Sequence, residues 1–240
     1  MDTKKILGVI GGVGPQATAD FADMLVRMTD AQRDQDHIRA LIFNDSAVPD
    51  RTDFILGRSG EDPLPVMTAD ARLLEKAGAS LIAVPCNTAH YFYDEISAAV
   101  GVPVVNIIEE TLRYTAKTLP GAVKVGLMAT KGTVAAGSYK KYAAGTGIEI
   151  IDPDEETADR LMDLIYGRIK AGLPADRDGF ESIVSTFFDR GCGAVILGCT
   201  ELSVAARELG LDDPRLIDSL GVLARVCIEK CGGKVRNPKE

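Results

Sequence analysis

Two cysteines occupy matching positions in the two halves of this chain. Cys86 follows the apolar run 81–84 and a proline, and Cys199 follows the apolar run 194–197 and a glycine. A short continuous apolar run predicts a strand buried on both faces of a parallel sheet. The small polar residues after each cysteine indicate the start of a helix. We therefore expect both thiols at strand-to-helix turns, the edge of a parallel sheet where ligands bind.

A thiol in such a turn is suited to proton transfer. The helix N-terminus carries a partial positive charge, which favours a thiolate over a thiol. If Cys86 and Cys199 face each other across one cleft, one thiolate can remove a proton from a substrate carbon. The other thiol then delivers a proton from the opposite side, which inverts a stereocentre. The alternative is that both are structural, since free cysteine is among the most buried residue types.

The elements that must position these thiols occur twice. We expect strands at 5–10, 39–43, 81–85 and 102–105, and again at 124–128, 148–151, 194–197 and 215–217. Landmarks recur at an offset of ~115 residues, and they pair Gly8 with Gly126, Cys86 with Cys199 and Asn106 with Asp218. The repeat predicts an α/β protein of two pseudo-symmetric lobes, each a four-stranded parallel sheet flanked by helices, with the active site between them. We assign residues 1–107 and 219–240 to the first lobe and residues 108–218 to the second.

Charge and composition exclude several classes of partner. The 240-residue chain has 46% hydrophobic residues and a formal net charge of -8, so its surface would repel nucleic acid and anionic membranes. No apolar run approaches the roughly 18 residues that a membrane span needs. Residues 1–5 lead into the first strand without the apolar segment of a signal peptide. We expect a cytoplasmic protein, with a tail from Gly232 that is frayed.

Five stretches of the chain together resemble a known family. They are Gly11-Gly12-Val13-Gly14-Pro15, Val48-Pro-Asp-Arg51-Thr52, Pro85-Cys86-Asn87-Thr88, Ile165-Tyr-Gly-Arg-Ile-Lys170 and Gly198-Cys199-Thr200-Glu201. Over most of its length the chain resembles the PLP-independent aspartate/glutamate racemases, and the two cysteine motifs are the most specific part. The resemblance implies racemisation of an acidic amino acid by two bases with no cofactor. It also implies a homodimer whose C-terminal helix packs back on the first lobe.

The resemblance assigns roles to particular residues. Cys86 and Cys199 would be the two catalytic bases. The substrate-binding residues would be Gly12, Arg51, Asn87, Thr88, Thr130, Lys170, Thr200 and Glu201. Arg51 and Lys170 would neutralise the substrate carboxylates, while the amide and hydroxyl side chains hold the α-carboxylate and the enolate-like charge.

Three of these side chains also have simpler interpretations. Arg51 lies in a polar loop, irregular from 48 to about 65, and could be solvated, although arginine binds carboxylates bidentately. Lys170 ends a predicted helix, 157–170, where a cation merely complements the helix dipole. Glu201 could cap its helix or orient a base, and we favour capping.

Two further patterns point to other chemistry. Gly12-x-Gly14-x-x-Ala17 after a strand is a degenerate fingerprint of a dinucleotide-binding oxidoreductase. Against this interpretation, Pro15 removes a backbone N–H from the turn that would cradle the pyrophosphate. Cys227 and Cys231 lie one helical turn apart, but no second Cys or His pair completes a metal site nearby. We therefore predict no metal.

Two alternatives to an acidic amino-acid racemase remain, one enzymatic and one without catalysis. Relatives of this architecture isomerise maleate, decarboxylate malonates or racemise hydantoins, so the acidic substrate depends on Arg51 and Lys170. A non-catalytic amino-acid-binding protein would keep the same pocket without turnover. His90, four residues after Cys86, could tune that thiol, although we favour a packing or surface role.

Overall fold

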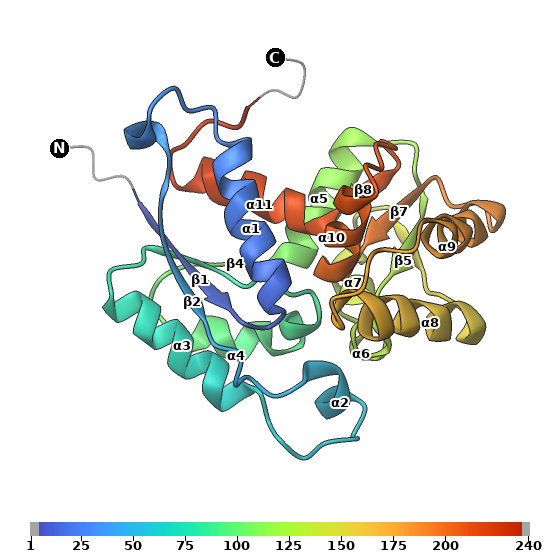
Figure 1. The fold of residues 1–240 in the computed structure, drawn as a ribbon, viewed down its shortest axis with the longest axis horizontal. Coiled ribbons are helices and arrows are strands. Elements are labelled where there is room, and N and C mark those ends of the chain that lie inside the picture. Colours follow the sequence, from blue (N-terminus) through green and yellow to red (C-terminus); the bar gives the residue numbers. More distant parts are fainter. Residues whose placement is uncertain (1–4, 237–240) are drawn as a thin grey trace.

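Two parallel sheets organise the computed structural model, which describes residues 5–236 (Figure 1). The first sheet, in the order β2-β1-β3-β4, contains β1 (Ile6–Gly11), β2 (Arg39–Asn44), β3 (Leu81–Ala83) and β4 (Val104–Val105). The second, in the order β6-β5-β7-β8, contains β5 (Lys124–Met128), β6 (Glu149–Ile151), β7 (Ala194–Leu197) and β8 (Leu216–Asp218). All neighbouring strands are parallel. The predicted fold of two lobes with equivalent four-stranded sheets is confirmed.

The glycines that match between the halves have the same structural reason. A Cβ at Gly8, in β1, would lie 2.8 Å from the Cβ of Ala79, and a Cβ at Gly126, in β5, would lie 2.5 Å from the ring of Phe187. Each first strand is therefore approached so closely by the layer packed on it that only glycine fits.

The third matched pair caps equivalent helices. The side chain of Asn106 accepts hydrogen bonds from two backbone N–H groups at the start of α5 (Ile107–Thr118). Asp218 accepts one from Leu220 at the start of α11 (Ser219–Lys230). Asn106 directly follows the fourth strand of the first lobe and Asp218 is the last residue of the fourth strand of the second, so the duplication extends to the caps.

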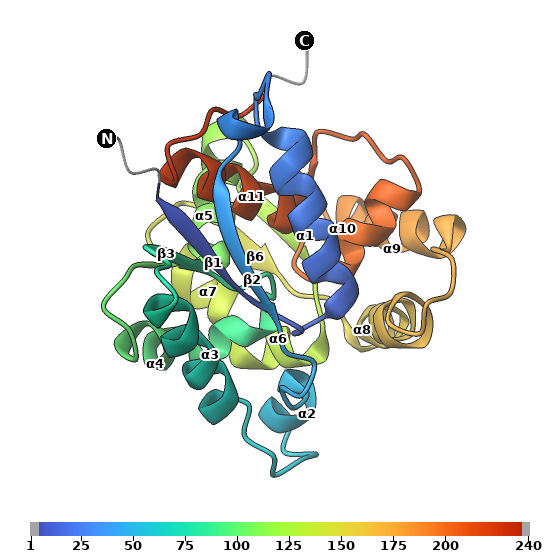
Figure 2. The same cartoon turned by 60° about the vertical axis from the view of Figure 1, so that its left-hand side comes forward.

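Helices cover both faces of the first sheet. Figure 2 shows α1 (Pro15–Met28) and α11 on one side of it, and α3 (Leu64–Lys76) and α4 (Tyr93–Ala98) on the other. The side chains of β1 alternate accordingly, because successive residues of a strand point to opposite faces. Leu7 belongs to the apolar cluster with α1 and α11, whereas Ile10 belongs to the cluster with α3.

The second lobe has a similar cover. Its helices are α6 (Lys131–Ala136), α7 (Ser138–Ala143), α8 (Glu155–Met162), the π-helix η3 (Asp163–Ile169), α9 (Arg177–Asp189) and α10 (Thr200–Glu208).

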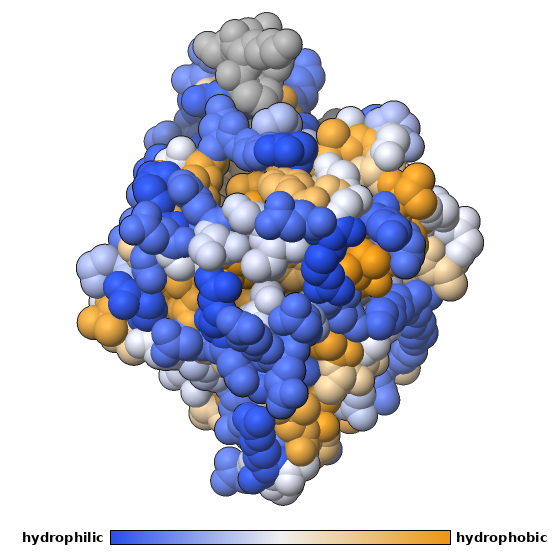
Figure 3. Space-filling model, turned by 90° about the vertical axis from the view of Figure 1, so that its right-hand side faces the viewer, coloured by the Kyte–Doolittle hydropathy of each residue, from blue (hydrophilic) through white to orange (hydrophobic). Residues whose placement is uncertain are grey.

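Blue, hydrophilic side chains predominate on the face in Figure 3, and the orange ones lie between them in separate groups. Within residues 5–236 no helix is long and apolar enough to cross a membrane.

One apolar cluster joins the two lobes. It includes Leu7 of β1, Val125 of β5, Leu112 of α5 and Leu223 of α11, all at most 1% exposed. Helix α11 packs on α1 and β3 of the first lobe and also on α5. The lobes therefore share a core on the side away from their cleft, and this core fixes how the two sheet edges face each other.

Two local expectations are wrong, and a third is confirmed only in part. The loop from 48 to about 65 contains a short helix, α2 (Arg51–Ile55), because Asp50 caps it by accepting from the Asp53 N–H. The helix expected at 157–170 begins at Glu155 and widens into η3. The tail is not frayed up to residue 236, because the Arg236 N–H donates to the Met28 carbonyl at 2.7 Å. Residues 1–4 and 237–240 lie outside the described range.

Candidate active site

Both cysteines line one closed cavity between the lobes. Its walls are Val13, Arg51, Thr52, Cys86, Asn87 and Thr88 of the first lobe and Thr130, Tyr166, Lys170, Cys199, Thr200 and Glu201 of the second. Every site residue predicted from the sequence except Gly12 is among them. Cys86 is 7% exposed and Cys199 is 5% exposed. The equivalent turns of the duplicated lobes thus bring two thiols to one enclosed space.

Gly12 lies outside this cavity, in a neighbouring hollow of about 720 Å³. Its N–H donates to the Thr18 hydroxyl at 3.0 Å, so the amide is already used within the turn. With φ at +80°, a Cβ here would overlap the Asp45 carbonyl at 2.0 Å. Gly12 therefore lets the turn pass the end of β2, and its amide is not directed at the cavity.

Three charged residues form the wall between the cavity and this hollow. Arg51, Lys170 and Glu201 line both spaces. The cavity has a volume of about 10 Å³, which is room for about one water molecule. An amino acid can occupy it only if part of this wall moves, and the hollow is the side from which it would arrive.

Cys199 is held as a thiol. It is the N-cap residue of α10, and its Sγ donates to Glu201 Oε2 at 2.9 Å. Burial and the Glu201 carboxylate raise the pKa of the Cys199 thiol well above its ordinary value, and Lys170 opposes them only in part. The expectation that the helix N-terminus would favour a thiolate is wrong at Cys199, because desolvation and a neighbouring carboxylate outweigh the dipole.

Glu201 does not cap its helix. One carboxylate oxygen, Oε2, accepts from Cys199 and from the Thr200 hydroxyl at 3.3 Å. The other, Oε1, lies 3.5 Å from the ammonium of Lys170, and Glu201 is only 4% exposed. The favoured capping interpretation is therefore replaced by a buried carboxylate that connects a thiol with a cation.

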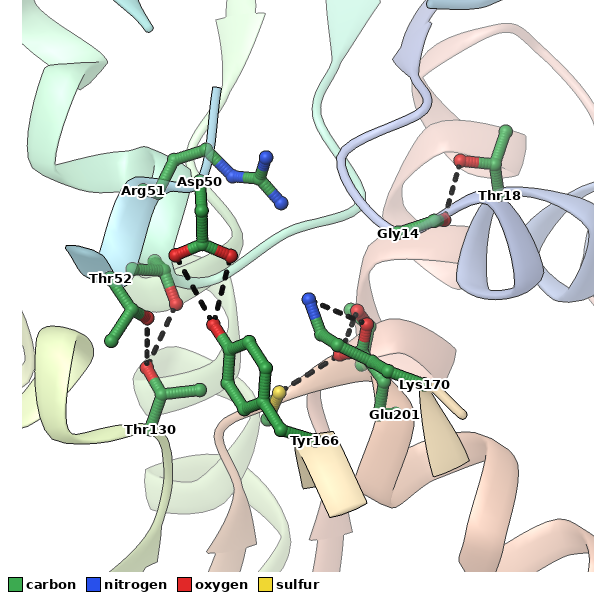
Figure 4. Close-up of polar contacts among 12 residues, drawn as sticks. Gly14, Thr18, Asp50, Arg51, Thr52, Thr130, Tyr166, Lys170 and Glu201 are labelled. Atoms are coloured by element: carbon green, nitrogen blue, oxygen red, sulfur yellow. Dashed lines mark hydrogen bonds and ion pairs between the residues drawn. The ribbon is translucent and has the colours of Figure 1, made fainter. Parts of the chain in front are cut away.

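Lys170 reaches the cavity from the end of the π-helix. Its backbone N–H donates to the Ile165 carbonyl, five residues earlier, at 2.9 Å, a spacing that is frequent at functional sites. Its ammonium lies 4.6 Å from the centroid of the Tyr166 ring and points toward Glu201 (Figure 4). Burial lowers the pKa of Lys170, but Glu201 and Tyr166 raise it above its ordinary value, so the group stays charged.

Arg51 is a buried cation with a free donor. It is the first residue of α2 and is 6% exposed. Its Nη1 donates to the carbonyls of Val48, at 3.2 Å, and Pro49, at 2.9 Å. Its buried Nε has no hydrogen-bond partner among residues 5–236. An unpaired donor on a buried guanidinium is costly, and an anionic ligand in the cavity would satisfy it.

Cys86 stands in a different kind of turn. It precedes the short 3₁₀-helix η2 (Thr88–Phe92) by two residues, so it is not the N-cap of an α-helix. His90 is buried, and burial lowers its pKa. Its Nε2 accepts from the Ile107 N–H at 3.2 Å, so Nδ1 carries the proton and donates to the Cys86 carbonyl at 2.8 Å. His90 thus fixes the backbone of the Cys86 turn, and the surface role is excluded.

Hydroxyl and amide side chains join the lobes across the cavity. Thr130 hydrogen-bonds with Thr88 at 3.1 Å and accepts from Thr52 at 3.3 Å. The side-chain amide of Asn87 accepts from the Tyr139 hydroxyl of the second lobe at 2.7 Å, and it also donates to Ser219, at the start of α11, at 3.0 Å. These bonds hold the first-lobe turn against the second lobe in the closed state.

Tyr166 is a cavity residue that the sequence analysis did not single out. Its hydroxyl donates to Asp50 of the first lobe, at 3.1 Å to Oδ2 (Figure 4). Tyr166 precedes Lys170 by four residues, and residues at that spacing lie on the same face of a helix. This spacing was the signal available in the sequence.

The remaining three cysteines are buried in the apolar cores, away from the cavity. Cys227 and Cys231 are 0% and 2% exposed within the core cluster of α11, and Cys192 packs in the core of the second lobe. Between residues 5 and 236 no group of three or more His, Cys, Asp or Glu side chains is arranged to hold a metal ion.

Comparison with known proteins gives one consistent picture. The sequence model of a family described as Asp/Glu/hydantoin racemase matches residues 10–227. The chain is 32% identical over 141 residues to the broad specificity amino-acid racemase RacX of Bacillus subtilis (strain 168), an alignment covering 56% of this chain and 59% of RacX. The chain thus spans about three-fifths of that relative's length.

Solved structures resemble it over nearly their whole length. The aspartate racemase of Picrophilus torridus superposes with a TM-score of 0.79 at 30% identity, covering 97% of this chain and 96% of that one. An aspartate racemase homologue from Pyrococcus horikoshii OT3 gives a TM-score of 0.74 at 28% identity, with 96% and 100% covered.

Proposed function

The chain belongs to the Asp/Glu/hydantoin racemase family, and we propose that it interconverts the L and D forms of an acidic amino acid, aspartate or glutamate. The observation that supports this proposal is the cavity that is lined by two thiols from equivalent turns together with the buried cation Arg51 and the partly exposed cation Lys170. Two thiols suit a reaction that needs a base and an acid on opposite sides of one carbon. Two cations suit a substrate with two carboxylates.

The proposed reaction moves one proton on each side of the substrate. A thiolate at Cys86 takes the α-proton, and the thiol of Cys199 gives its proton to the opposite side of the same carbon. The first sulfur ends as a thiol and the second as a thiolate, and the reverse reaction exchanges these roles. The chemistry needs no cofactor.

The α-proton is a weak acid, so the site must stabilise the charge that develops as it leaves. The guanidinium of Arg51, with its free Nε, supports the substrate carboxylate on which that charge accumulates. Thr88 and Thr200 also line the cavity, and their hydroxyls, which bond to Thr130 and Glu201 in the present structure, would turn to donate to the same carboxylate. Lys170 is then available for the side-chain carboxylate of the substrate.

The test is a chiral assay of the purified protein without added PLP, on a panel of L- and D-amino acids and, separately, on a 5-substituted hydantoin. Aspartate is tested first, because a solved relative at 30% identity is an aspartate racemase. We expect both enantiomers of aspartate or glutamate to approach the racemic mixture, and apolar amino acids to react far more slowly. Binding of acidic amino acids with no change in optical rotation would contradict the proposal and favour a binding protein. The family resemblance also supports a homodimer, which sedimentation tests.

A further inference from the structure

The carboxylate of Glu201 serves two groups at once. Its Oε2 accepts the proton donor of Cys199 at 2.9 Å, while its Oε1 faces the ammonium of Lys170 at 3.5 Å. Glu201 is 4% exposed, and the Lys170 side chain is 25% exposed. Within residues 5–236 this carboxylate is the only ion-pair partner of Lys170.

Cys199 and Glu201 share one proton, and Lys170 influences which of them holds it. Lys170 also lowers the pKa of the Cys199 thiol, but its ammonium faces Oε1 of the carboxylate directly, and we infer that this contact keeps the negative charge on Glu201 and the proton on sulfur. If the ammonium moves away, Oε1 loses its cation while the contact of Oε2 with Sγ remains. The S–H bond then breaks, an O–H bond forms at Oε2, and Cys199 is left as a thiolate. The number of protons and the total charge of the pair do not change.

The position of Lys170 connects this proton to the substrate. Lys170 is part of the wall between the hollow and a cavity that holds about one water, so this wall must move when a substrate binds. A substrate with a second carboxylate offers Lys170 a new anion. Each such substrate would therefore draw the ammonium off Oε1 as it takes its place.

We propose that Glu201 is the proton acceptor of Cys199, and that the side-chain carboxylate of the substrate activates it by taking Lys170 away. This inference rests on the proposed function, because it needs a dicarboxylic substrate. Glu201 acts through Cys199 as a positioning residue. Under this proposal the substrate needs its side-chain carboxylate for turnover as well as for binding.

The cycle closes without any further reagent. Substrate binding moves the proton from Cys199 to Glu201, and Cys199 then takes the α-proton while Cys86 delivers its own. When the product leaves and Lys170 returns, Glu201 releases its proton through solvent to the Cys86 thiolate. In the opposite direction the same steps run in reverse: Cys86 first gives its proton through solvent to Glu201 and then takes the α-proton, while Cys199 delivers its own proton and recovers one from Glu201.

Thiol labelling tests the inference without turnover. Iodoacetamide modifies both cavity cysteines, and fragment mass spectrometry gives the ratio of labelling at Cys199 to that at Cys86 at pH 7. In Lys170→Met we expect this ratio to rise about tenfold, which corresponds to one pKa unit. A wider opening would speed both sites and leave the ratio unchanged. Loss of a positive charge alone would lower the ratio.

Two variants complete the labelling test. The double variant with Lys170→Met and Glu201→Gln keeps the opened wall but lacks the acceptor, so the rise should disappear. Lys140→Met removes a half-exposed lysine that pairs with Asp152, far from the thiols in the sequence, and serves as the charge-matched control. A ratio that stays level or falls in Lys170→Met, or that rises equally in the double variant, would overturn the inference. The other titratable or charged side chains at the cavity wall are Asp50, Arg51, Cys86 and Tyr166, and the variants leave all four unchanged.

The role of the substrate carboxylate is tested with succinate or glutarate, which are achiral dicarboxylates. Calorimetry measures their binding. On binding, the wild-type protein should gain the ultraviolet absorbance of one thiolate, and Glu201→Gln should bind without this gain. Binding to the wild type with no thiolate signal would refute the switch. Failure of the chiral assay with these results intact would remove the proposed function and leave the proton switch standing.

Discussion

The two thiol turns occupy the same place in duplicated lobes but differ in the residue two positions after the cysteine. After Cys199 this residue is Glu201, whose buried carboxylate accepts the thiol proton. After Cys86 it is Thr88, whose hydroxyl bonds to Thr130 and Thr133 of the other lobe. The shared topology therefore brings the two cysteines to one cavity, while the position two residues later differs: it places a carboxylate on Sγ of Cys199 and a bond to the other lobe after Cys86.

The largest expected effect comes from removing either thiol. Cys86→Ala and Cys199→Ala should each lower racemisation of aspartate by about 10³-fold or more, because each removes a proton-transfer group. Chiral chromatography measures the loss. Cys192→Ala is the matched control. Cys192 is buried in the core of the second lobe, so this variant should racemise aspartate at the normal rate. Retained activity in both cavity variants would show that the two turns are not a catalytic pair.

Arg51 carries the next largest effect. Its buried guanidinium has one free donor, so Arg51→Ala should lower kcat/KM on the order of 100-fold, the cost of truncating one partner of a buried charge pair. Arg51→Lys keeps the charge without the planar fork and should recover only part of the loss. Initial rates in both directions measure this. An Arg51→Ala enzyme with normal KM and kcat would place the substrate carboxylate elsewhere.

Removing the carboxylate after Cys199 should make the two turns more alike. Glu201 raises the pKa of the Cys199 thiol, so Glu201→Gln should lower that pKa and move alkylation of Cys199 to lower pH. The measurement is the pH profile of labelling at this residue. Glu208→Gln, on the exposed end of the same helix, should leave the profile in place. A shift to higher pH would contradict the assigned contact.

Tyr166→Phe tests the closure between the lobes with a smaller effect. The change removes the hydrogen bond to Asp50 but keeps the ring beside Lys170. One hydrogen bond to a charged group contributes about 1.5–3 kcal/mol, and part of it is recovered by water when the site opens. We expect a several-fold rise in KM with a smaller change in kcat. Tyr91→Phe, on an exposed ring, is the control.

The smallest effect concerns stability away from both turns. Burial and the nearby Asp45 raise the pKa of Asp70 to about 6. The folded state therefore favours the neutral carboxyl, and the stability from this group is present at acid pH and lost as the pH rises through about 6. Asp70→Asn should raise the melting temperature by a few degrees at pH 8 and by less at pH 4, with activity unchanged. An equal effect at both pH values would contradict the assignment.

Much of this arrangement could be predicted from sequence patterns. Apolar runs ending at Cys86 and Cys199 located the two turns, and the pairing of Gly8 with Gly126 indicated the duplication. The π-helix could not be predicted, because its pattern of apolar residues is that of an α-helix. The contact of Glu201 with Cys199 corresponds to the less favoured of the two sequence interpretations, orienting a base, since a carboxylate at this position usually caps its helix. Lys170, which is distant in sequence, forms an ion pair with the Glu201 carboxylate and holds it away from the helix N-terminus.

The central claim is that the two sulfurs act from opposite sides of one carbon, and racemisation in deuterated water tests it most directly. The reaction is stopped early, the enantiomers are separated, and the deuterium at the α-carbon of each is measured by mass spectrometry. With two bases, the product should carry solvent deuterium while the recovered substrate still carries its proton. A product that retains the original proton would mean that one group both removes and returns it, and the paired-thiol account would be wrong.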